Sequence, residues 1–407
     1  MAYLPLANIL HHKLRSFLSA AGIGCGICML VTLSGLARGS LNEVADRWEA
    51  VSADLIVYPG GWGRNMTTLA GIGVPDSHAG IIRQKAGRHV SRVVPVFLWP
   101  MRLGGQDQLA AGVDADDFAM LTGGRPPAQG RLFDPNGTFA AWLEELLLSP
   151  AEEGAEDEPL EIDSRTAFAH PAHDGLELVI DTRLAGKTNL GVGEKVTVAD
   201  HEWEIVGIVP AGGMSRVYLP RRTAQYLFGA GSIQRSTLLF VELTEEADRS
   251  AAARAIREAT GAEVVPLEQY RAMLEEKFGV LYRYVDAVNV VALVIAFLFI
   301  MNTLYTMVLQ RTRDVAILKS CGAPPARIVA QVMAESLLLT GLGAAMGIAA
   351  SFAAGWAITT YTLYTVNINP TWIAVALLAA AAGAIISALY PAYQAARVDV
   401  LEALTLE

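Results

Sequence analysis

Three long uncharged runs constrain this chain more than any other feature. One extends without Asp, Glu, Lys or Arg over 61 residues, from Ser336 to Ala396, and shorter ones cover Phe17–Ala37 and Ala287–Gln310. A helix needs about 20 apolar residues to cross a bilayer. The 61-residue run therefore suits two crossings, separated by a turn near Pro370. The sequence predicts an α-helical membrane protein with four transmembrane helices.

Composition supports this prediction and excludes several other classes of protein. Charged residues make up 18% of the chain and hydrophobic residues 53%, whereas soluble domains carry about 25% charged residues. Three cysteines in 407 residues exclude a disulfide scaffold. The net charge of -10 argues against nucleic acid as a partner. Residues 38–284 hold 24 basic and 35 acidic side chains, so the acidity is concentrated in one block.

Basic residues in the short segments set the predicted orientation, because they favour the cytoplasmic side. They are Lys13, Arg15, Arg311, Arg313, Lys319, Arg327 and Arg397. The predicted layout is a cytoplasmic tail (1–16), helices at 17–37, 285–309, 329–361 and 372–390, an external domain (38–284), a cytoplasmic loop (310–328), a short external loop (362–371) and a cytoplasmic tail (391–407). A cleaved signal peptide at the first span stays an alternative.

The external block is predicted to be a mixed α/β (α+β) domain between the first and second helices. Runs rich in β-branched residues predict strands at 51–58, 90–98, 176–181, 195–199, 203–209 and 238–243, and Pro95 would confine its strand to an edge. Residues 244–260 predict a helix capped by Thr244, and 266–284 a second helix. Acidic residues 152–163 are interpreted as a solvated loop.

No motif in the sequence indicates an enzyme or a metal site. Gly186-Lys187-Thr188 lacks the first glycine of a phosphate-binding loop. Cys25 and Cys28 have redox spacing but lie inside a predicted span, where packing is the favoured interpretation. His170 and His173 lack a fourth ligand. The chain is therefore not expected to be an enzyme or to bind a cofactor itself.

Two pairs of glycines inside the spans predict close helix packing. They have the small-xxx-small spacing and comprise Gly22, Gly26, Gly343 and Gly347. Glycine at such positions lets helix backbones approach one another, within a chain or between two chains. The pattern is compatible with a dimer and does not require one.

The loop after the second span combines charged and apolar residues, which predicts a docking surface. The candidate residues are Arg311, Arg313, Asp314, Val315, Ile317, Leu318, Lys319, Gly322 and Ala323. Gly322 would end a short helix in the left-handed conformation, and Pro324 and Pro325 would begin the next one. The alternative is a basic loop that only anchors the spans.

This loop and the chain ends resemble the MacB/FtsX-like permeases, the membrane subunits of type VII ABC transporters. In that family the loop begins with the pattern R-T-R-E-I. A leucine and the pattern G-A-S follow, and a glutamate comes at the third span. The matching residues are Arg311-Thr312-Arg313-Asp314-Val315, Leu318, Gly322-Ala323, Glu335, Pro391-Ala392, Ala395-Ala396 and Glu402-Ala403-Leu404. The chain departs from the pattern at Pro324 and Val400. The resemblance covers nearly the whole chain.

The resemblance implies specific partners and a mechanism. Such permeases pair with a second copy or a related permease in the bacterial inner membrane and bind two copies of a cytoplasmic ABC ATPase, which holds ATP and Mg. The ATPase is expected as a separate polypeptide whose work moves the external domain (mechanotransmission), with an external adaptor or lipoprotein as a further partner. Two subdomains are implied, one from 38–105 with 233–284 and one from 106–232. A helix from Leu267 to Leu318 could act as a rod, with Gly279 as its weak point.

Three functions stay open on the sequence alone. The first is an ABC permease that exports or extracts an amphiphile, peptide or lipoprotein at the outer side. The second is a signalling assembly that controls an external cell-wall hydrolase. The third is a membrane receptor without an ATPase. The size of the external block favours the first.

Overall fold

The computed structural model describes most of the chain. The described residues are 13–60, 73–134, 176–198, 201–228, 234–310 and 312–397. The chain divides into a helical unit, Met1–Leu41 with Lys277–Glu407, and an α/β unit, Asn42–Glu276. The sequence motifs at 152–163 and at His170 and His173 lie outside the described residues.

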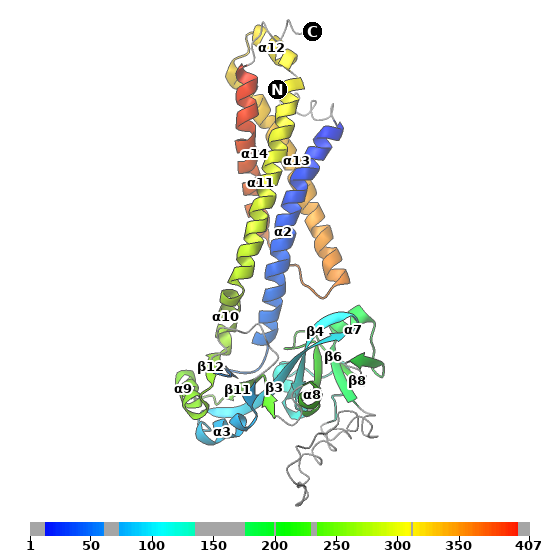
Figure 1. Ribbon diagram of the computed structural model, residues 1–407, viewed down its shortest axis with the longest axis vertical. Coiled ribbons are helices and arrows are strands. Elements are labelled where there is room, and N and C mark those ends of the chain that lie inside the picture. Colours follow the sequence, from blue (N-terminus) through cyan, green and yellow to red (C-terminus); the bar gives the residue numbers. More distant parts are fainter. Residues whose placement is uncertain are drawn as a thin grey trace, which may run out of the picture. The chain divides into compact units, whose positions relative to one another are not determined.

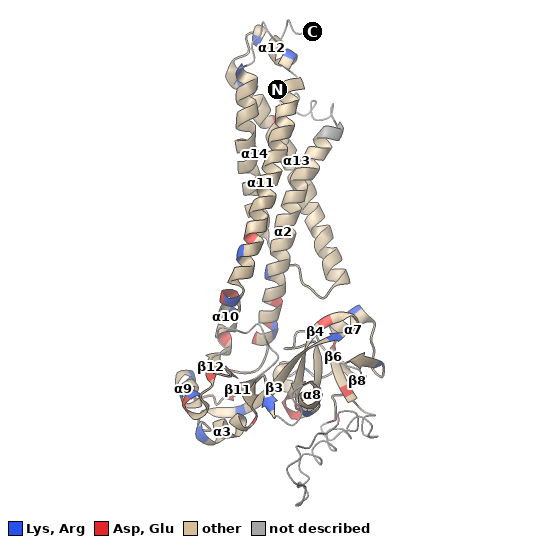
Figure 2. Ribbon diagram, in the orientation of Figure 1, with Lys and Arg blue, Asp and Glu red and all other residues tan. Residues whose placement is uncertain are grey.

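Among its described residues, the helical unit contains four long helices and one short one (Figure 1). They are α2 (Lys13–Glu49), α11 (Gly279–Gln310), α12 (Thr312–Ser320), α13 (Pro325–Tyr361) and α14 (Pro370–Arg397). The four long helices are apolar enough to cross a membrane, and Figure 2 shows that charged residues are nearly absent from their middle parts. The prediction of four membrane helices is confirmed.

Small and branched side chains fill the centre of this unit. Ile23 and Ile27 of α2 pack in one cluster with Leu304 of α11, Leu339 of α13 and Ala380 of α14. Many large apolar side chains face outward instead. They include Leu298, Trp356, Leu378 and Ile386. Such exposure is costly in water but suits a helix surrounded by lipid.

The α/β unit contains a ten-stranded mixed sheet with the order β12-β1-β11-β3-β4-β9-β6-β8-β5, in which β7 pairs with β8. The strands are β1 (Leu55–Tyr58), β3 (Val90–Leu103), β4 (Gln106–Val113), β5 (Gln129–Gly130), β6 (Leu176–Asp181), β7 (Lys195–Val198), β8 (His201–Val209), β9 (Val217–Pro220), β11 (Leu238–Leu243) and β12 (Glu263–Pro266), and β2 (Val74–Pro75) pairs with β10 (Arg235–Ser236). The mixed α/β prediction is confirmed.

The α-helices that the structure describes in this unit are short. They are α3 (Ser77–Lys85), α4 (Phe118–Leu121), α7 (Thr182–Thr188), α8 (Arg221–Phe228), α9 (Arg249–Thr260) and α10 (Tyr270–Lys277). Successive residues of a strand point to opposite faces of the sheet, and each face packs into its own hydrophobic core. Leu55 and Val57 of β1 pack with residues of α3 and α9, whereas Ile56 and Tyr58 pack with Trp48 of α2.

Strand β3 joins the two parts of the sheet. One part contains β12, β1 and β11, and the other contains β4, β9, β6, β8, β7 and β5. Its first half, Val90 to Val96, pairs with β11, and its second half, Phe97 to Leu103, pairs with β4. The sequence predicted a shorter strand at an edge because of Pro95. The strand is longer than predicted and joins β11 to β4, but its half with Pro95 pairs on one side alone among the described residues, so the edge prediction holds locally at Pro95. Pro95 is tolerated because its half of β3 has a ladder with β11 alone.

Two helix predictions also need correction. Helix α9 begins at Arg249, and its cap is Asp248, whose carboxylate accepts a hydrogen bond from the Ser250 N–H at 2.9 Å. Thr244 is not the cap. The single helix predicted over 266–284 is interrupted, since α10 ends at Lys277, Phe278 forms a turn and α11 begins at Gly279. A continuous rod from Leu267 to Leu318 is therefore absent.

Candidate functional site

Helix α12 and the start of α13 form the α12 hairpin, residues 312–330. Its turn is a Schellman cap, because Gly322 has φ +84° and donates to Lys319 O at 2.9 Å, while Ala323 donates to Leu318 O at 3.1 Å. Pro324 is extended and Pro325 begins α13. The backbone of Gly322 thus adopts the left-handed conformation that the sequence predicts.

The apolar surface of the hairpin is smaller than predicted. Val315 packs inward against a cluster of α11, α13 and α14 residues that includes Ile328 and Ala392, so it is not part of an exposed surface. Ile317 and Leu318 remain 48% and 39% exposed. They form an unpartnered apolar pair in the part of the chain that the structure describes.

The charged residues of the hairpin differ in their roles. Lys319 donates from Nζ to the Ala396 carbonyl at 2.7 Å, which ties α12 to the end of α14. Arg313 is exposed. Arg311 and the side chain of Asp314 lie outside the described residues. Of the predicted docking residues, Arg313, Ile317 and Leu318 therefore have exposed side chains.

The four glycines singled out in the sequence all lie at contacts between helices of this chain. A Cβ at Gly22 would lie 3.3 Å from the side chain of Phe299, and one at Gly26 would lie 3.1 Å from that of Ala296. Both partners are on α11. A Cβ at Gly347 would lie 2.5 Å from Gly24 O on α2, and one at Gly343 would also contact α2. These glycines therefore pack against other helices of the same chain.

Two buried hydrogen bonds link α2 to α11, and sequence analysis did not single them out. Ser19 Oγ lies 2.7 Å from Thr303 Oγ1, and Asn289 Nδ2 donates to Ser34 Oγ at 2.9 Å. Polar bonds of this kind hold helices together in lipid, where water cannot replace them.

In the α/β unit, the last turns of α2 contact α10 at what we call the helix base: Glu43, Asp46, Arg47, Trp48, Glu49, Tyr270 and Arg271. The rings of Trp48 and Tyr270 are stacked, with centroids 4.4 Å apart. Arg271 forms ion pairs with Asp46 at 2.6 Å and with Glu49 at 2.8 Å. These side-chain hydrogen bonds raise the pKa of Arg271, which stays charged.

Glu43 is the second anchor of the helix base. Its carboxylate accepts hydrogen bonds from Arg216, beside β9, and from Arg183 of α7 at 2.9 Å. Arg47 donates to the carbonyls of Gly213 and Met214 at 3.2 and 3.1 Å. Burial lowers the pKa of Arg216, so Glu43 offsets a desolvation cost. The end of α2 is thereby fixed to the α/β sheet.

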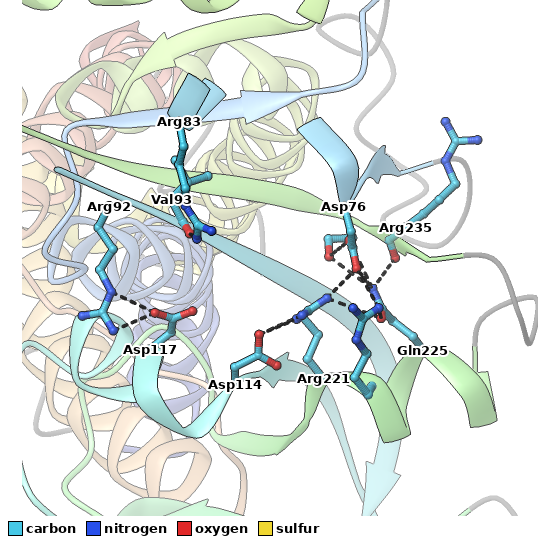
Figure 3. Close-up of polar contacts among 11 residues, drawn as sticks. Asp76, Arg83, Arg92, Val93, Asp114, Asp117, Arg221, Gln225 and Arg235 are labelled. Carbon is cyan, nitrogen blue, oxygen red and sulfur yellow. Dashed lines mark hydrogen bonds and ion pairs between the residues drawn. The ribbon is translucent and has the colours of Figure 1, made fainter. Parts of the chain in front are cut away.

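A third polar network crosses between the two parts of the sheet (Figure 3). Arg221 of α8 forms an ion pair with Asp114, after β4, at 2.7 Å and another with Asp76, which precedes α3. Asp76 also accepts from Gln225 of α8 at 3.1 Å and from Ser236 of β10 at 2.6 Å. Because the guanidinium of Arg221 is buried and doubly paired, it fixes the two parts together.

The described residues contain no group of three His, Cys, Asp or Glu side chains that could hold a metal ion. What they contain is an exposed hairpin on the helical unit and a helix base that fixes α2 and α10 within the α/β unit.

Two family models match the chain. The MacB-like periplasmic core domain matches residues 16–259, and the FtsX-like permease C-terminal domain matches residues 287–400. The chain belongs to the MacB/FtsX-like permeases. The family resemblance seen in the sequence is thus confirmed, and the protein is an ABC transporter permease.

Two relatives of this permease are each about a quarter identical to it in sequence. It is 24% identical to the macrolide export ATP-binding/permease protein MacB of Hyphomonas neptunium over 97% of this chain, and spans 58% of that protein. It is also 24% identical over 53% of its length to an uncharacterised ABC transporter permease, YknZ, of Bacillus subtilis, of which 57% is covered. The periplasmic region of MacB from Actinobacillus actinomycetemcomitans superposes with a TM-score of 0.36, at 14% identity, covering 56% of this chain and 94% of that one.

Alignment with MacB is confined to the permease part and does not include the ATPase domain. The helix base of the permease was missed by sequence reasoning because its partners are far apart along the chain. The one available signal was the cluster of Asp46, Arg47, Trp48 and Glu49 directly after an uncharged run.

Proposed function

We propose that this permease couples ATP hydrolysis by a separate cytoplasmic ABC ATPase to a movement of its α/β domain. The domain would act at the outer side of the bacterial inner membrane, on an amphiphile, peptide or lipoprotein. Two ATPase copies, which hold ATP and Mg, would bind two permease chains, either identical or related. An external adaptor or lipoprotein is a further partner in this proposal.

The helix base is the observation that carries the proposal. Helix α2 is one helix of 37 residues that contributes to both units, and its last two turns are held by the Trp48 stack and the Glu43 ion pairs. Hydrogen bonds along the axis make a helix stiff against compression. A displacement of α2 would therefore be passed to the sheet through these side chains.

The turn at Phe278 supports a division of labour between the two connecting helices. Because α10 and α11 are separate, the backbone at Phe278 can absorb a change of angle that an unbroken helix would resist. In this proposal α2 transmits the displacement, and the junction at Phe278 is the hinge.

The α12 hairpin is the proposed ATPase contact. Ile317 and Leu318 offer an exposed apolar pair beside Arg313, and the Schellman cap and the Lys319 bond to Ala396 hold the hairpin on the bundle. An exposed apolar pair outside the lipid region is stabilised when a partner covers it. The MacB relative of Hyphomonas neptunium is named an ATP-binding/permease protein, which supports the pairing of this permease with an ATPase.

A pull-down of the tagged full chain with ABC ATPases from the same cell tests the contact. We expect Leu318→Asp to abolish capture of the ATPase, because it places a charge in the apolar pair. The matched control is Val192→Asp, which changes an equally exposed valine of the α/β unit and should leave capture unchanged. Failure of the unmodified chain to capture any ATPase would refute the proposal.

A further inference from the structure

An arginine lies over two aromatic rings at one end of the helical unit. Arg38 of α2 is the first charged residue after the uncharged run Phe17–Ala37. Its Cζ atom lies 4.4 Å from the ring centroid of Trp372 on α14 and 5.0 Å from that of Tyr282 on α11. Three helices therefore bring one guanidinium and two rings together.

The guanidinium of Arg38 has no acceptor among the described residues, where it makes neither a hydrogen bond nor an ion pair. Carboxylates are scarce around it, since α14 has none and α2 has none before Glu43. Asp286, one turn from Tyr282 on α11, makes no ion pair with Arg38 within 4.0 Å. A contact with an aromatic ring supplies no oxygen acceptor, so the N–H groups of Arg38 can still donate to an anion.

The neighbouring loop holds this arrangement in place. The N–H of Asn367 donates to the Gly35 carbonyl at 3.0 Å, and a Cβ at Gly39 would lie 2.5 Å from the Thr365 carbonyl oxygen. These two glycines have the small-xxx-small spacing and let the backbone of the loop lie against α2. Trp372 follows this loop directly, so its position relative to Arg38 is set by backbone contacts.

We propose that Arg38, Tyr282 and Trp372 bind the phosphate of a membrane lipid. A planar guanidinium matches phosphate oxygens in a bidentate manner. Aromatic side chains and the first charge beyond an apolar run are typical of the level at which lipid headgroups lie. Val375, one turn further along α14, is exposed and offers an apolar surface to an acyl chain. Free phosphate shares the headgroup chemistry but would gain nothing from that surface.

Native mass spectrometry of the full chain, titrated with phosphatidylglycerol in detergent, tests the site. We expect Arg38→Gln to weaken lipid binding about tenfold, and Arg38→Lys to weaken it less, because the charge remains without the fork. Arg283→Gln is the matched control, since Arg283 is exposed on α11 and its Nε donates only to Gly279 O of its own helix at 3.3 Å. It should leave lipid binding within about twofold.

Excess inorganic phosphate distinguishes the two sources of the anion. We expect it to leave the bound lipid in place. Displacement at lipid-like concentrations would replace the lipid site with a simple anion site and overturn the proposal. Equal losses in the Arg38→Gln and Arg283→Gln variants would also overturn it, because they would indicate general attraction to the membrane. Trp372→Ala tests the aromatic part of the site separately. It should weaken lipid binding although it leaves every charge in place.

Discussion

The indole ring of Trp48 lies flat on the phenol ring of Tyr270, with centroids 4.4 Å apart and ring planes 7° apart. The two residues are far apart in sequence, and they join the helix that enters the α/β unit to the helix that leaves it. Both rings are buried, and Phe240 of β11 meets Trp48 edge to face at 5.9 Å. The pair therefore links α2, α10 and the sheet.

Trp48→Ala should destabilise the α/β unit strongly. The loss of a buried aromatic ring and the cavity that remains cost about 3–5 kcal/mol. Trp48→Phe keeps an aromatic contact and should cost clearly less. Thermal unfolding of the full chain in detergent, followed by circular dichroism, measures both. Equal melting temperatures for the two variants would show that the stack contributes little.

Glu43→Gln should also lower stability, because it removes the charge of the nearer carboxylate and leaves the buried guanidinium of Arg216 with the longer ion pair to Asp181, at 4.0 Å. Removal of one member of a buried pair costs about 3 kcal/mol. The exposed pair Lys195–Glu202, at 3.4 Å, provides the comparison. Glu202→Gln should change stability by less than about 1 kcal/mol. A larger loss in Glu202→Gln than in Glu43→Gln would contradict the assignment of Glu43 as an anchor.

Gly347→Leu should separate α2 from α13. Its side chain would meet Gly24 backbone atoms, which cannot move aside without a shift of the whole helix. Overpacking of this kind costs about 1–3 kcal/mol. Gly341→Leu is the control, since no atom lies within 4 Å of a Cβ at that position. The melting temperature should fall in the first variant and be maintained or rise in the second.

Alkaline pH should reveal the buried phenol of Tyr218. Burial raises the pKa of Tyr218 to about 12 from its usual 10.0. The folded state therefore keeps this proton where the unfolded state has lost it. The stability that the protonated Tyr218 phenol contributes is fully present below pH 10 and is lost as the pH rises towards 12. Tyr218→Phe should show a shallower fall of melting temperature across this window. Identical slopes would contradict the burial of the phenol.

Some elements could be predicted from sequence and others could not. Strands β6 and β11 match their predicted bounds because each is a short, continuous run of apolar and β-branched residues between breaks. The cap of α9 was misplaced because Thr244 and Asp248 are both good caps, and the choice depends on the loop between them.

The candidate site was harder to predict than the fold. The spacing of Gly322 and Ala323 defined the hairpin turn, since a local cap depends on neighbouring residues. The same reasoning could not show that Val315 packs inward, because that depends on α13 and α14. The bond between Glu43 and Arg216 joins residues 173 positions apart, and no local pattern reports such a pair.

Hydrogen–deuterium exchange on the permease–ATPase complex tests the central proposal most directly. The proposal predicts that ATP and Mg change the exchange of residues 277–282, at the hinge, while residues 42–49 at the helix base stay protected. Leu318→Asp should abolish the change. A complex that hydrolyses ATP at its normal rate with unchanged exchange at residues 277–282 would contradict movement of the α/β domain through this hinge.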